Sequence, residues 1–400
     1  MSKVYLLGPC RTPIGKMGGA LAEVSAVELG ALVIRETLHR SGIPAEQVDH
    51  VYMGCVIQAG LGQNIARQAA LKAGIPFTAT AETLNIVCGS GLEAVNSAAR
   101  MIRTGEADIV VAGGTESMSK APFAIMEGRY GYRMGSPMMN TPLVDTMVND
   151  ALWDAANNYH MGITAENVAE KWGISRQELD EFAAASQQKA TAAISEGRFE
   201  EEIVPVVIKN RKGDIIVNMD EGPRPGTTAD SLARLKPAFK PDGIVTAGNS
   251  SGINDGAAAI VVVSEKKVKE LGLAPFAEWV DGALGGVDPS IMGVGPVAST
   301  KKLFKKTGLT IDDMDLVEAN EAFAAQSIAV QRELNISKEK LNVNGGAIAL
   351  GHPVGASGCR ILVTLLHAMR QRKARIGLAT LCIGGGMGCS TIVRMNENEI

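Results

Sequence analysis

Two parts of the chain repeat one another, and this internal repeat limits the folds that the sequence can adopt. Residues 37–54 contain a helix end, a glycine turn, an acidic linker and a short apolar strand, and residues 302–320 contain the same features in the same order. Residues 90–114 and 357–386 form a second pair, each with an amphipathic helix, an apolar strand and a group of glycines. Both pairs are separated by about 266 residues. Two chance similarities would rarely share one offset, so the sequence predicts a duplicated α/β unit.

Each repeated unit alternates strands with helices, and its strands are short and rich in Val and Ile. Such strands are usually buried on both faces of a sheet. We therefore expect two similar α/β halves that pack with their sheets face to face, with helices between them and outside them.

The composition changes between the two repeated units. An irregular stretch at 121–142, rich in Met, Gly, Pro and Arg, is followed by a helical segment predicted at 164–194. The change in composition indicates that this part is an insertion into the first half. The predicted domains are an N-terminal half at 1–119 and 249–270, an inserted loop domain at 120–248, and a C-terminal half at 271–400.

Composition and charge exclude several classes of protein. The formal net charge is −4, without the concentrated Lys and Arg of a nucleic-acid-binding surface. The N-terminus lacks the features of a signal peptide, and no apolar run approaches the ~18 residues that a membrane span needs. We therefore expect a cytoplasmic protein whose six cysteines are reduced.

Cys88 is the first candidate for chemistry. It lies in the sequence Asn-Ile-Val-Cys-Gly-Ser-Gly, after a short apolar strand and just before a helix predicted to begin near Ser90. The free N–H groups and the dipole at a helix N-terminus would stabilise a thiolate. A buried structural cysteine in a glycine turn would give the same pattern, so the residues alone leave both interpretations open.

Three further segments carry polar groups that could take part in chemistry. His352 lies in a glycine-rich run and could act as the base of a Cys–His pair, although a hydrogen-bonded turn histidine fits as well. Cys382 lies just past a predicted strand end, and the glycines from Gly384 onward offer N–H groups to an oxyanion. Asn320 also follows a strand and could bind a water or a carbonyl oxygen, or cap a helix.

These four segments, in this order, resemble the thiolase family. The segment around Cys88 is similar to the family's acylation site, and the Asn-Glu-Ala-Phe sequence at 320–323 to its asparagine motif. The Gly-His-Pro sequence at 351–353 and the Cys-Ile-Gly-Gly-Gly sequence at 382–386 are similar to its histidine and second-cysteine motifs. The resemblance covers essentially the whole chain, because it also includes residues 11–15, 58–68 and 248–252.

The resemblance implies a fold and a reaction. The fold class would be α/β, with duplicated βαβαβ halves in αβαβα layers and an inserted loop domain. The members that this chain resembles most convert two acetyl-CoA reversibly into acetoacetyl-CoA and CoA. The alternative is a 3-ketoacyl-CoA thiolase of broader chain-length range, which acts in fatty-acid degradation.

The resemblance also implies roles for individual residues. Cys88 would take the acyl group as a thioester, and His352 would activate it. Cys382 would remove the α-proton of the second acyl-CoA, or return it in the reverse direction. A water held by Asn320, together with His352, would form one oxyanion hole, and the N–H groups of Cys88 and Gly384 would form the other.

The family further implies how substrate binds and how the chain assembles. Arg224 and Ser231 would lie near the nucleotide end of CoA, and Ser251 near its pantetheine. His160 and Met161 would lie over the acyl pocket. The expected partners are acetyl-CoA, acetoacetyl-CoA and CoA, with no tightly bound cofactor, no metal, no nucleic acid and no membrane. A homotetramer, a dimer of dimers built through the insertion, is expected.

Two other kinds of protein share features with this sequence: a different enzyme and a binding protein without catalytic activity. A decarboxylating ketoacyl synthase has the same duplicated fold but uses one cysteine with two polar partners, so Cys382 argues against it. A non-catalytic acyl-CoA carrier would be expected to lack Cys88 or His352. Zinc is not expected, because the sequence has no Cys-x-x-Cys or His-x₃-His spacing.

Overall fold

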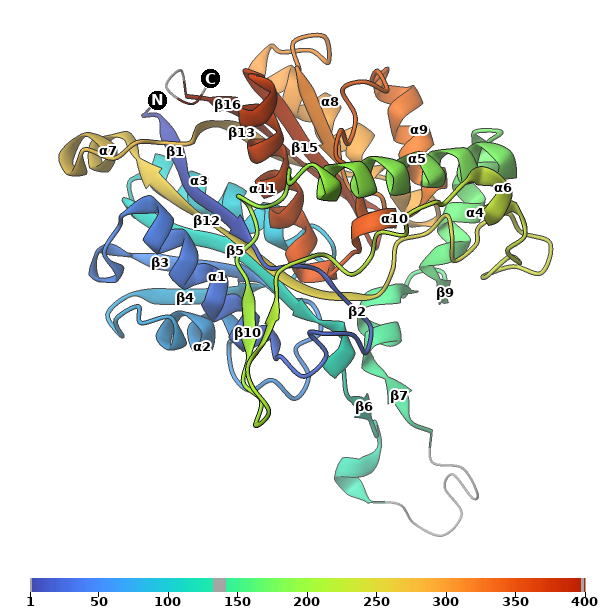
Figure 1. Cartoon of the computed structure of the whole chain (residues 1–400), viewed down its shortest axis with the longest axis horizontal. Helices are drawn as coiled ribbons and strands as arrows, with labels where there is room; N and C mark the ends of the chain where they lie inside the picture. Colours follow the sequence, from blue (N-terminus) through green and yellow to red (C-terminus); the bar gives the residue numbers. More distant parts are fainter. Residues whose placement is uncertain (1, 132–141, 397–398, 400) are drawn as a thin grey trace.

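The computed structural model describes residues 2–131, 142–396 and 399, and within them the main feature is a ten-stranded sheet (Figure 1). Its strands run in the order β14-β15-β16-β13-β1-β12-β5-β3-β4, with the short β2 paired to β12. Their bounds are β1 Val4–Arg11, β2 Gly15–Lys16, β3 His50–Gly54, β4 Thr80–Leu84, β5 Ile109–Ser117, β12 Asn254–Ser264, β13 Ala277–Gly286, β14 Leu316–Ala319, β15 Ile376–Ile383 and β16 Met387–Met395.

The sheet consists of two halves with the same topology, which confirms the duplication. In the first half β3 is parallel to β5, which is antiparallel to β12, which is antiparallel to β1. In the second half β14, β15, β16 and β13 follow the same order with the same directions. The halves were predicted as separate sheets, but three residue pairs between β1 and β13 join them at one end.

Helices lie between and outside the two half-sheets. The helices are α1 Ala26–Ser41, α2 Ile65–Lys72, α3 Ser90–Thr104, α4 Met161–Lys171, α5 Arg176–Ser195, α6 Ala229–Ala233, α7 Glu265–Leu271, α8 Gly295–Thr307, α9 Ala324–Leu334, α10 Ala347–Leu350 and α11 Val354–Arg372. Helices α3 and α11 pack against each other and against strands of both halves, while α1 and α2 cover the first half-sheet and α8 the second. These are the expected αβαβα layers.

The two central helices cross at a pair of glycines. A Cβ atom on Gly91 of α3 would lie 2.8 Å from the backbone nitrogen of Cys359, and one on Gly358 of α11 would lie 2.3 Å from that of Leu92. The repeated Ser-Gly pairs are therefore explained by close helix packing. Helix α11 is buried on nearly all sides, as expected for a helix between two sheets, and begins at Val354, three residues before the predicted start.

The chain between β5 and β12 forms the insertion. The single helical segment predicted at 164–194 is two helices, α4 and α5, because the chain turns at Gly173 with φ of +60° and Ser175 caps α5 in a capping box. Three small hairpins complete it: β6 Phe123–Ala124 with β7 Val144–Asp145, β8 Trp153–Asp154 with β9 Tyr159–His160, and β10 Val206–Ile208 with β11 Ile215–Val217.

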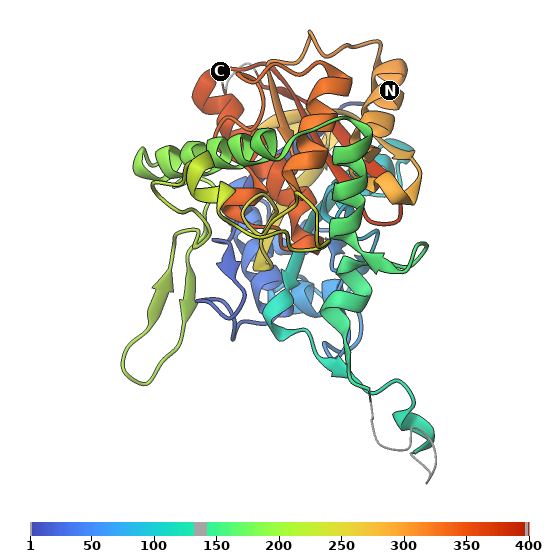
Figure 2. The same cartoon turned by 90° about the vertical axis from the view of Figure 1, so that its right-hand side faces the viewer.

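The β6–β7 pair extends away from the rest of the molecule (Figure 2). It comes from the stretch that the sequence marks as irregular, of which residues 132–141 lie outside the described residues. Within the described part of the chain, no helix has the length and apolar character needed to cross a membrane.

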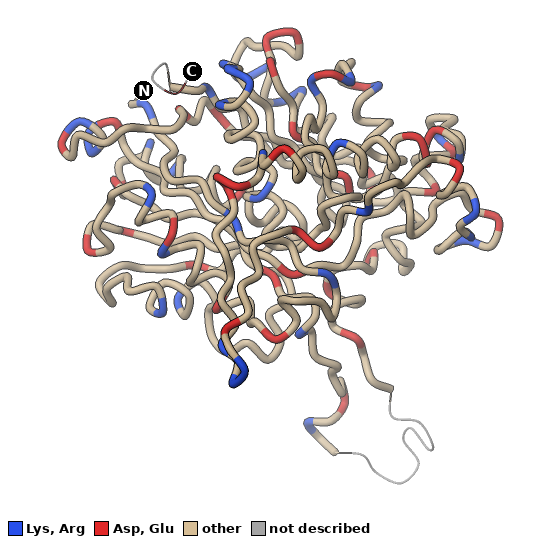
Figure 3. Tube along the Cα trace, viewed as in Figure 1, with Lys and Arg blue, Asp and Glu red and all other residues tan. Residues whose placement is uncertain are grey.

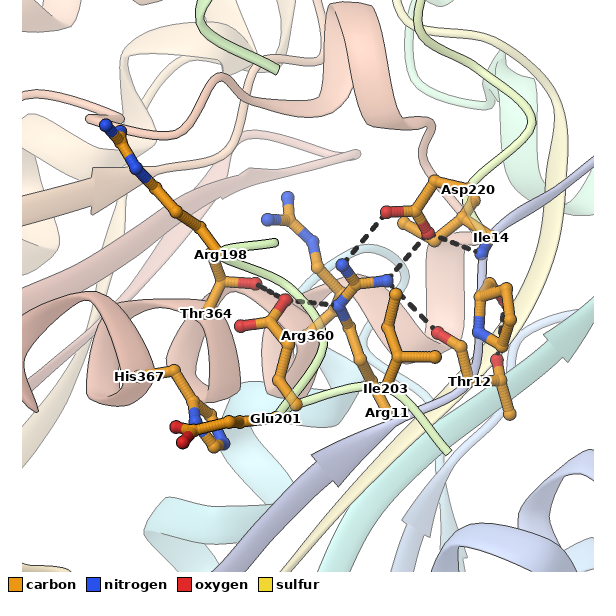
Figure 4. Close-up of polar contacts among 12 residues, drawn as sticks. Arg11, Thr12, Ile14, Arg198, Glu201, Ile203, Asp220, Arg360, Thr364 and His367 are labelled. Carbon is orange, nitrogen blue, oxygen red and sulfur yellow. Dashed lines mark hydrogen bonds and ion pairs between the residues drawn. The ribbon is translucent and has the colours of Figure 1, made fainter. Parts of the chain in front are cut away.

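A buried ion-pair network ties the insertion to the first strand (Figure 4). The Arg11 guanidinium lies 2.5 Å from a carboxylate oxygen of Glu202 and 2.7 Å from one of Asp220, and all three side chains are at most 1% exposed. Thr364 of α11 donates a second hydrogen bond to Glu202, and the backbone N–H of Ile14 donates one to Asp220. The network therefore joins β1, the insertion and α11.

Candidate active site

The predicted site residues lie at the ends of strands or at the start of helices. Cys88 follows β4, Asn320 follows β14, and Cys382 is the second-to-last residue of β15. His352 lies two residues before α11. Because the carboxyl ends of parallel strands meet at one edge of an α/β sheet, this position suits a binding site.

Cys88 sits in a strained turn. The preceding Val87 has φ of +52°, an unfavourable conformation for a β-branched residue that often marks a functional site. Ser90 holds the turn: its hydroxyl accepts a hydrogen bond from Ile86 N–H and donates one to the Val87 carbonyl. The cysteine is 9% exposed and lies two residues before α3.

The Cys88 thiol is protonated at neutral pH. Burial raises its pKa to about 11, and this effect exceeds the lowering by the backbone N–H groups of Gly384 and of Cys88 itself. The expected stabilisation of a thiolate by the helix N-terminus is therefore too small to ionise the resting thiol. The two N–H groups nevertheless point toward the sulfur, as an oxyanion hole beside it requires.

Cys382 and the following glycines form the hairpin between β15 and β16. Gly385 and Gly386 have φ of +87° and +88°, so the tight turn needs glycine at these positions. The Cys382 thiol is fully buried and lies 3.4 Å from Oε1 of Gln326, to which it can donate. Burial, with a smaller contribution from the neighbouring Cys88, raises its pKa above the ordinary value.

Hydrogen bonds fix the tautomer of His352. Its Nδ1 lies 2.6 Å from the hydroxyl of Ser357, and that hydroxyl donates to the Pro353 carbonyl at 2.8 Å. The serine oxygen must therefore accept from Nδ1–H, which leaves Nε2 with a free lone pair. Burial, and to a lesser extent Arg360, lowers the pKa of His352 to about 3, so the imidazole is neutral at pH 7.

Asn320 stands beside the free nitrogen of His352. Its Nδ2 lies 3.5 Å from Nε2, and its backbone N–H donates to the Thr380 carbonyl. Its Oδ1 is buried with no hydrogen-bond partner among the residues that the structure describes. A buried polar atom without a partner in the protein is rare, and such an atom is free to bind a water or a ligand.

A cleft of about 440 Å³ leads from the insertion toward His352. Arg224 and Ser231 line it at the end formed by the insertion, whereas Gly351 lines it beside the histidine. Ser251 is not among the lining residues; its backbone N–H bonds to the Ala322 carbonyl, while its neighbour Ser250 lines the cleft. Among the described residues, no group of three or more His, Cys, Asp or Glu is placed to hold a metal ion.

His160 and Met161 lie at the start of α4. The His160 ring caps this helix through Nδ1 and stacks on Phe239, with 4.7 Å between ring centroids. Phe239 in turn meets Phe323 edge to face. Met161 approaches Gly384, because a Cβ atom on this glycine would lie 2.9 Å from the methionine methyl group. Of these large side chains, Met161 is the one that lies beside Gly384.

Comparison with known proteins identifies the family. The family models described as the thiolase N-terminal and C-terminal domains match residues 4–266 and 273–395. The chain belongs to the thiolase family.

Individual relatives of this thiolase are similar over nearly their whole length. The acetyl-CoA acetyltransferases of Syntrophomonas wolfei and Pseudomonas aeruginosa are 58% and 57% identical to it, over 98% and 97% of this chain and 98% of each relative. The crystal structure of the Bacillus anthracis acetyl-CoA acetyltransferase has a TM-score of 0.96 at 44% identity, covering 99% of both chains. Human mitochondrial 3-ketoacyl-CoA thiolase has a TM-score of 0.95 at 42% identity, with the same coverage.

Sequence reasoning missed several residues of the thiolase site. Gln326 contacts Cys382, and Ser357 fixes the His352 tautomer. Glu116 is buried and accepts backbone N–H groups from the 55–57 loop and from the start of α11, which holds these two segments together. Lys16 lines the cleft with Arg224. Of these residues, only Ser357 could have been found from the sequence, because it lies four residues after the Gly-His-Pro sequence and thus close to His352.

Proposed function

We propose that this thiolase is an acetyl-CoA acetyltransferase, which joins two acetyl-CoA into acetoacetyl-CoA and CoA in a reversible Claisen condensation. The observation that carries the proposal is the pair of neighbouring thiols, Cys88 and Cys382, in a buried site that also contains a neutral imidazole. Condensation of two acyl groups needs a nucleophile that stores the first and a base that acts on the second. The names of the bacterial relatives support the choice of reaction.

In the first half-reaction Cys88 takes the acyl group. His352 accepts the thiol proton at Nε2 while the sulfur attacks the thioester carbonyl. Because burial makes this imidazole a weak base, it holds the proton briefly and passes it to the sulfur of the departing CoA. The products are a thioester on Cys88 and free CoA.

In the second half-reaction Cys382 acts on the α-carbon. Its thiol first releases a proton to solvent, and the thiolate then removes a proton from the methyl group of the second acetyl-CoA. The carbanion attacks the Cys88 thioester, and the Cys88 sulfur leaves as a thiolate that takes up one proton. One proton is released and one is taken up, so the reaction balances, and thiolysis is the same sequence in reverse.

Two sets of donors would stabilise the negatively charged oxygens. The N–H groups of Cys88 and Gly384 point toward the sulfur and would bind the oxyanion of the tetrahedral intermediate. A water that donates to the buried Oδ1 of Asn320 would donate its other hydrogen to the enolate oxygen of the second substrate, and His352 would be a second donor while its Nε2 carries a proton. The loss of one such donor typically reduces the rate by about 10²–10³-fold.

CoA would lie in the cleft with its phosphates toward the insertion. Arg224 and Ser231 are exposed there, and Lys16 adds a second positive charge. The pantetheine arm would pass Ser250, which lines the cleft and precedes Ser251 in the chain. Charged and hydroxyl groups at the open end, and buried chemistry at the closed end, suit a long substrate whose acyl group alone must reach Cys88.

The position of Met161 beside Gly384 predicts a preference for short acyl chains. We expect acetoacetyl-CoA to be cleaved with a kcat/KM at least tenfold above that for 3-ketoacyl-CoA of eight or more carbons, because the Met161 side chain would occupy space that further methylenes need. Thiolysis rates over a series of chain lengths measure this. Met161→Ala should reduce the ratio of kcat/KM for acetoacetyl-CoA to kcat/KM for the longer 3-ketoacyl-CoA. Equal kcat/KM across the series in the unmodified enzyme would favour the broad-range 3-ketoacyl-CoA thiolase instead.

We also propose a cytoplasmic homotetramer, a dimer of dimers built through the insertion at 120–248. The projecting β6–β7 segment exposes large apolar side chains, which include Phe123 at 62%, Met126 at 70% and Tyr130 at 89% exposed. Apolar and aromatic groups that gather on a projecting segment usually mark an interface. Light scattering should give a molar mass of four times the chain mass of 41.9 kDa. The Tyr130→Asp variant should give a lower molar mass, because a charge would be buried at the interface. A monomer in the unmodified protein would refute the proposal.

A further inference from the structure

The side chain of Gln326 connects Cys382 with the segment that carries Asn320. Gln326 lies in α9 and is 1% exposed. Its Oε1 lies 3.4 Å from the Cys382 sulfur, and its Nε2 lies 3.3 Å from the Asn320 carbonyl and 3.0 Å from the Ser327 hydroxyl. One buried amide thus contacts the proposed base and the backbone of the residue proposed to hold the oxyanion water.

The donors and acceptors around the Gln326 amide fix its orientation. The Ser327 hydroxyl donates to the Phe323 carbonyl at 3.0 Å, so its oxygen is free to accept from Nε2. The Asn320 carbonyl can only accept. Both Nε2 hydrogens are therefore used, and Oε1 must face Cys382. A flipped amide would set its oxygen against two acceptors and lose two hydrogen bonds, which makes the flip unfavourable.

Packing holds the side chain in place as well. Gly293 lies in the 3₁₀ segment Pro289–Val294, and a Cβ atom on it would lie 2.4 Å from the Cβ of Gln326. The glycine therefore lets this segment lie directly against the start of the Gln326 side chain. With both ends fixed, the amide presents its oxygen to the sulfur in a set geometry, as an oriented catalytic group requires.

We propose that Gln326 is a positioning residue for the proton transfer at the α-carbon, through the hydrogen bond that its Oε1 accepts from the Cys382 thiol. The inference rests on the proposed function, in which Cys382 exchanges a proton with substrate. In the resting enzyme the carbonyl oxygen holds the thiol hydrogen on the side of α9, which fixes the Cys382 side chain in one rotamer. After this proton has left, the thiolate meets the α-carbon of the substrate from the same position.

The test separates the two half-reactions. Deuterium exchange into the methyl group of acetyl-CoA in D₂O reports proton transfer at Cys382, and exchange of labelled CoA into acetyl-CoA reports acylation of Cys88. Gln326→Met has a similar volume without the amide. We expect it to slow deuterium exchange on the order of tenfold, the value of one hydrogen bond, and to change CoA exchange less than twofold. Gln331→Met on the same helix, where the amide bonds only to the Ile336 carbonyl, is the matched control and should change neither rate.

A second variant distinguishes the loss of this hydrogen bond from a loss of folding. A buried Gln326→Glu side chain would be protonated, and it would keep an oxygen toward Cys382 and an O–H toward Asn320. It should retain deuterium exchange within about threefold of the unmodified rate. The inference fails if Gln326→Met keeps normal deuterium exchange, if both rates fall together in Gln326→Met, or if Gln326→Glu is as slow as Gln326→Met. If the unmodified enzyme catalyses neither exchange, the proposed function itself is wrong.

Discussion

Replacement of Cys88 by alanine should abolish the acyl-enzyme, whereas replacement of Cys382 by serine should leave it and remove condensation. The first change deletes the sulfur that forms the thioester. The second keeps a group of similar size, but an alcohol is far less acidic than a thiol and cannot serve as the base at neutral pH. We expect Cys382→Ser to lower condensation on the order of 10²–10⁴-fold, the usual contribution of a general base.

Intact-mass spectrometry after addition of acetyl-CoA measures the acyl-enzyme, and formation of acetoacetyl-CoA measures condensation. Cys10→Ala is the control, because Cys10 is a buried cysteine of β1 in the outer core of the first half, and neither signal should change. Near-normal condensation by Cys382→Ser would remove Cys382 from the role of base. An acetylated Cys88→Ala protein would show that another group carries the acyl chain.

The duplicated fold could be predicted from the sequence because its signals are local and occur twice. Each half gives its own strand, glycine and helix pattern, and the shared offset links the two. The candidate site could be predicted for the same reason, since Cys88, Asn320 and Cys382 each stand at a strand end that is visible in the sequence.

Other features depend on contacts between distant segments. Gln326 is separated from Cys382 by 56 residues, and the hydrogen bond between them depends on how the tertiary fold places α9 relative to β15, with the segment Pro289–Val294 in contact with both. The protonated state of Cys88 depends on burial, which a local pattern of glycines and a helix start does not report. The join between the half-sheets consists of three residue pairs in strands that also fit separate sheets.

The prediction of a single helix at 164–194 was wrong for a reason that the sequence itself shows. The segment at 164–194 is apolar on one face across its whole length, so periodicity alone predicted a single helix. The sequence Ser-Arg-Gln-Glu from Ser175 to Glu178 is a capping box that marks a new helix start, and Gly173 stands just before it. In this case the cap was a stronger signal than the apolar stripe.

Loss of Arg11 should produce a large fall in stability. Its guanidinium neutralises both Glu202 and Asp220, and Arg11→Met would leave two buried carboxylates without a cation. Burial already raises the pKa of Glu202, with Arg11 opposing that shift, so without Arg11 the ionised form becomes still less favourable. We expect the free energy of unfolding to fall by about 3–5 kcal/mol, as when one partner of a buried pair is removed.

Unfolding in urea, followed by circular dichroism, measures the loss. Lys209→Met is the matched control: Lys209 pairs with Asp214 on the exposed β10–β11 hairpin, where Figure 3 shows basic residues at the tip, and its side chain is 83% exposed. Such surface pairs contribute about 1 kcal/mol or less. Combining Arg11→Met with Glu202→Gln and Asp220→Asn removes the unpaired charges and should recover most of the stability. If the triple variant were as unstable as Arg11→Met alone, packing around the guanidinium, and not its charge, would hold the insertion to β1.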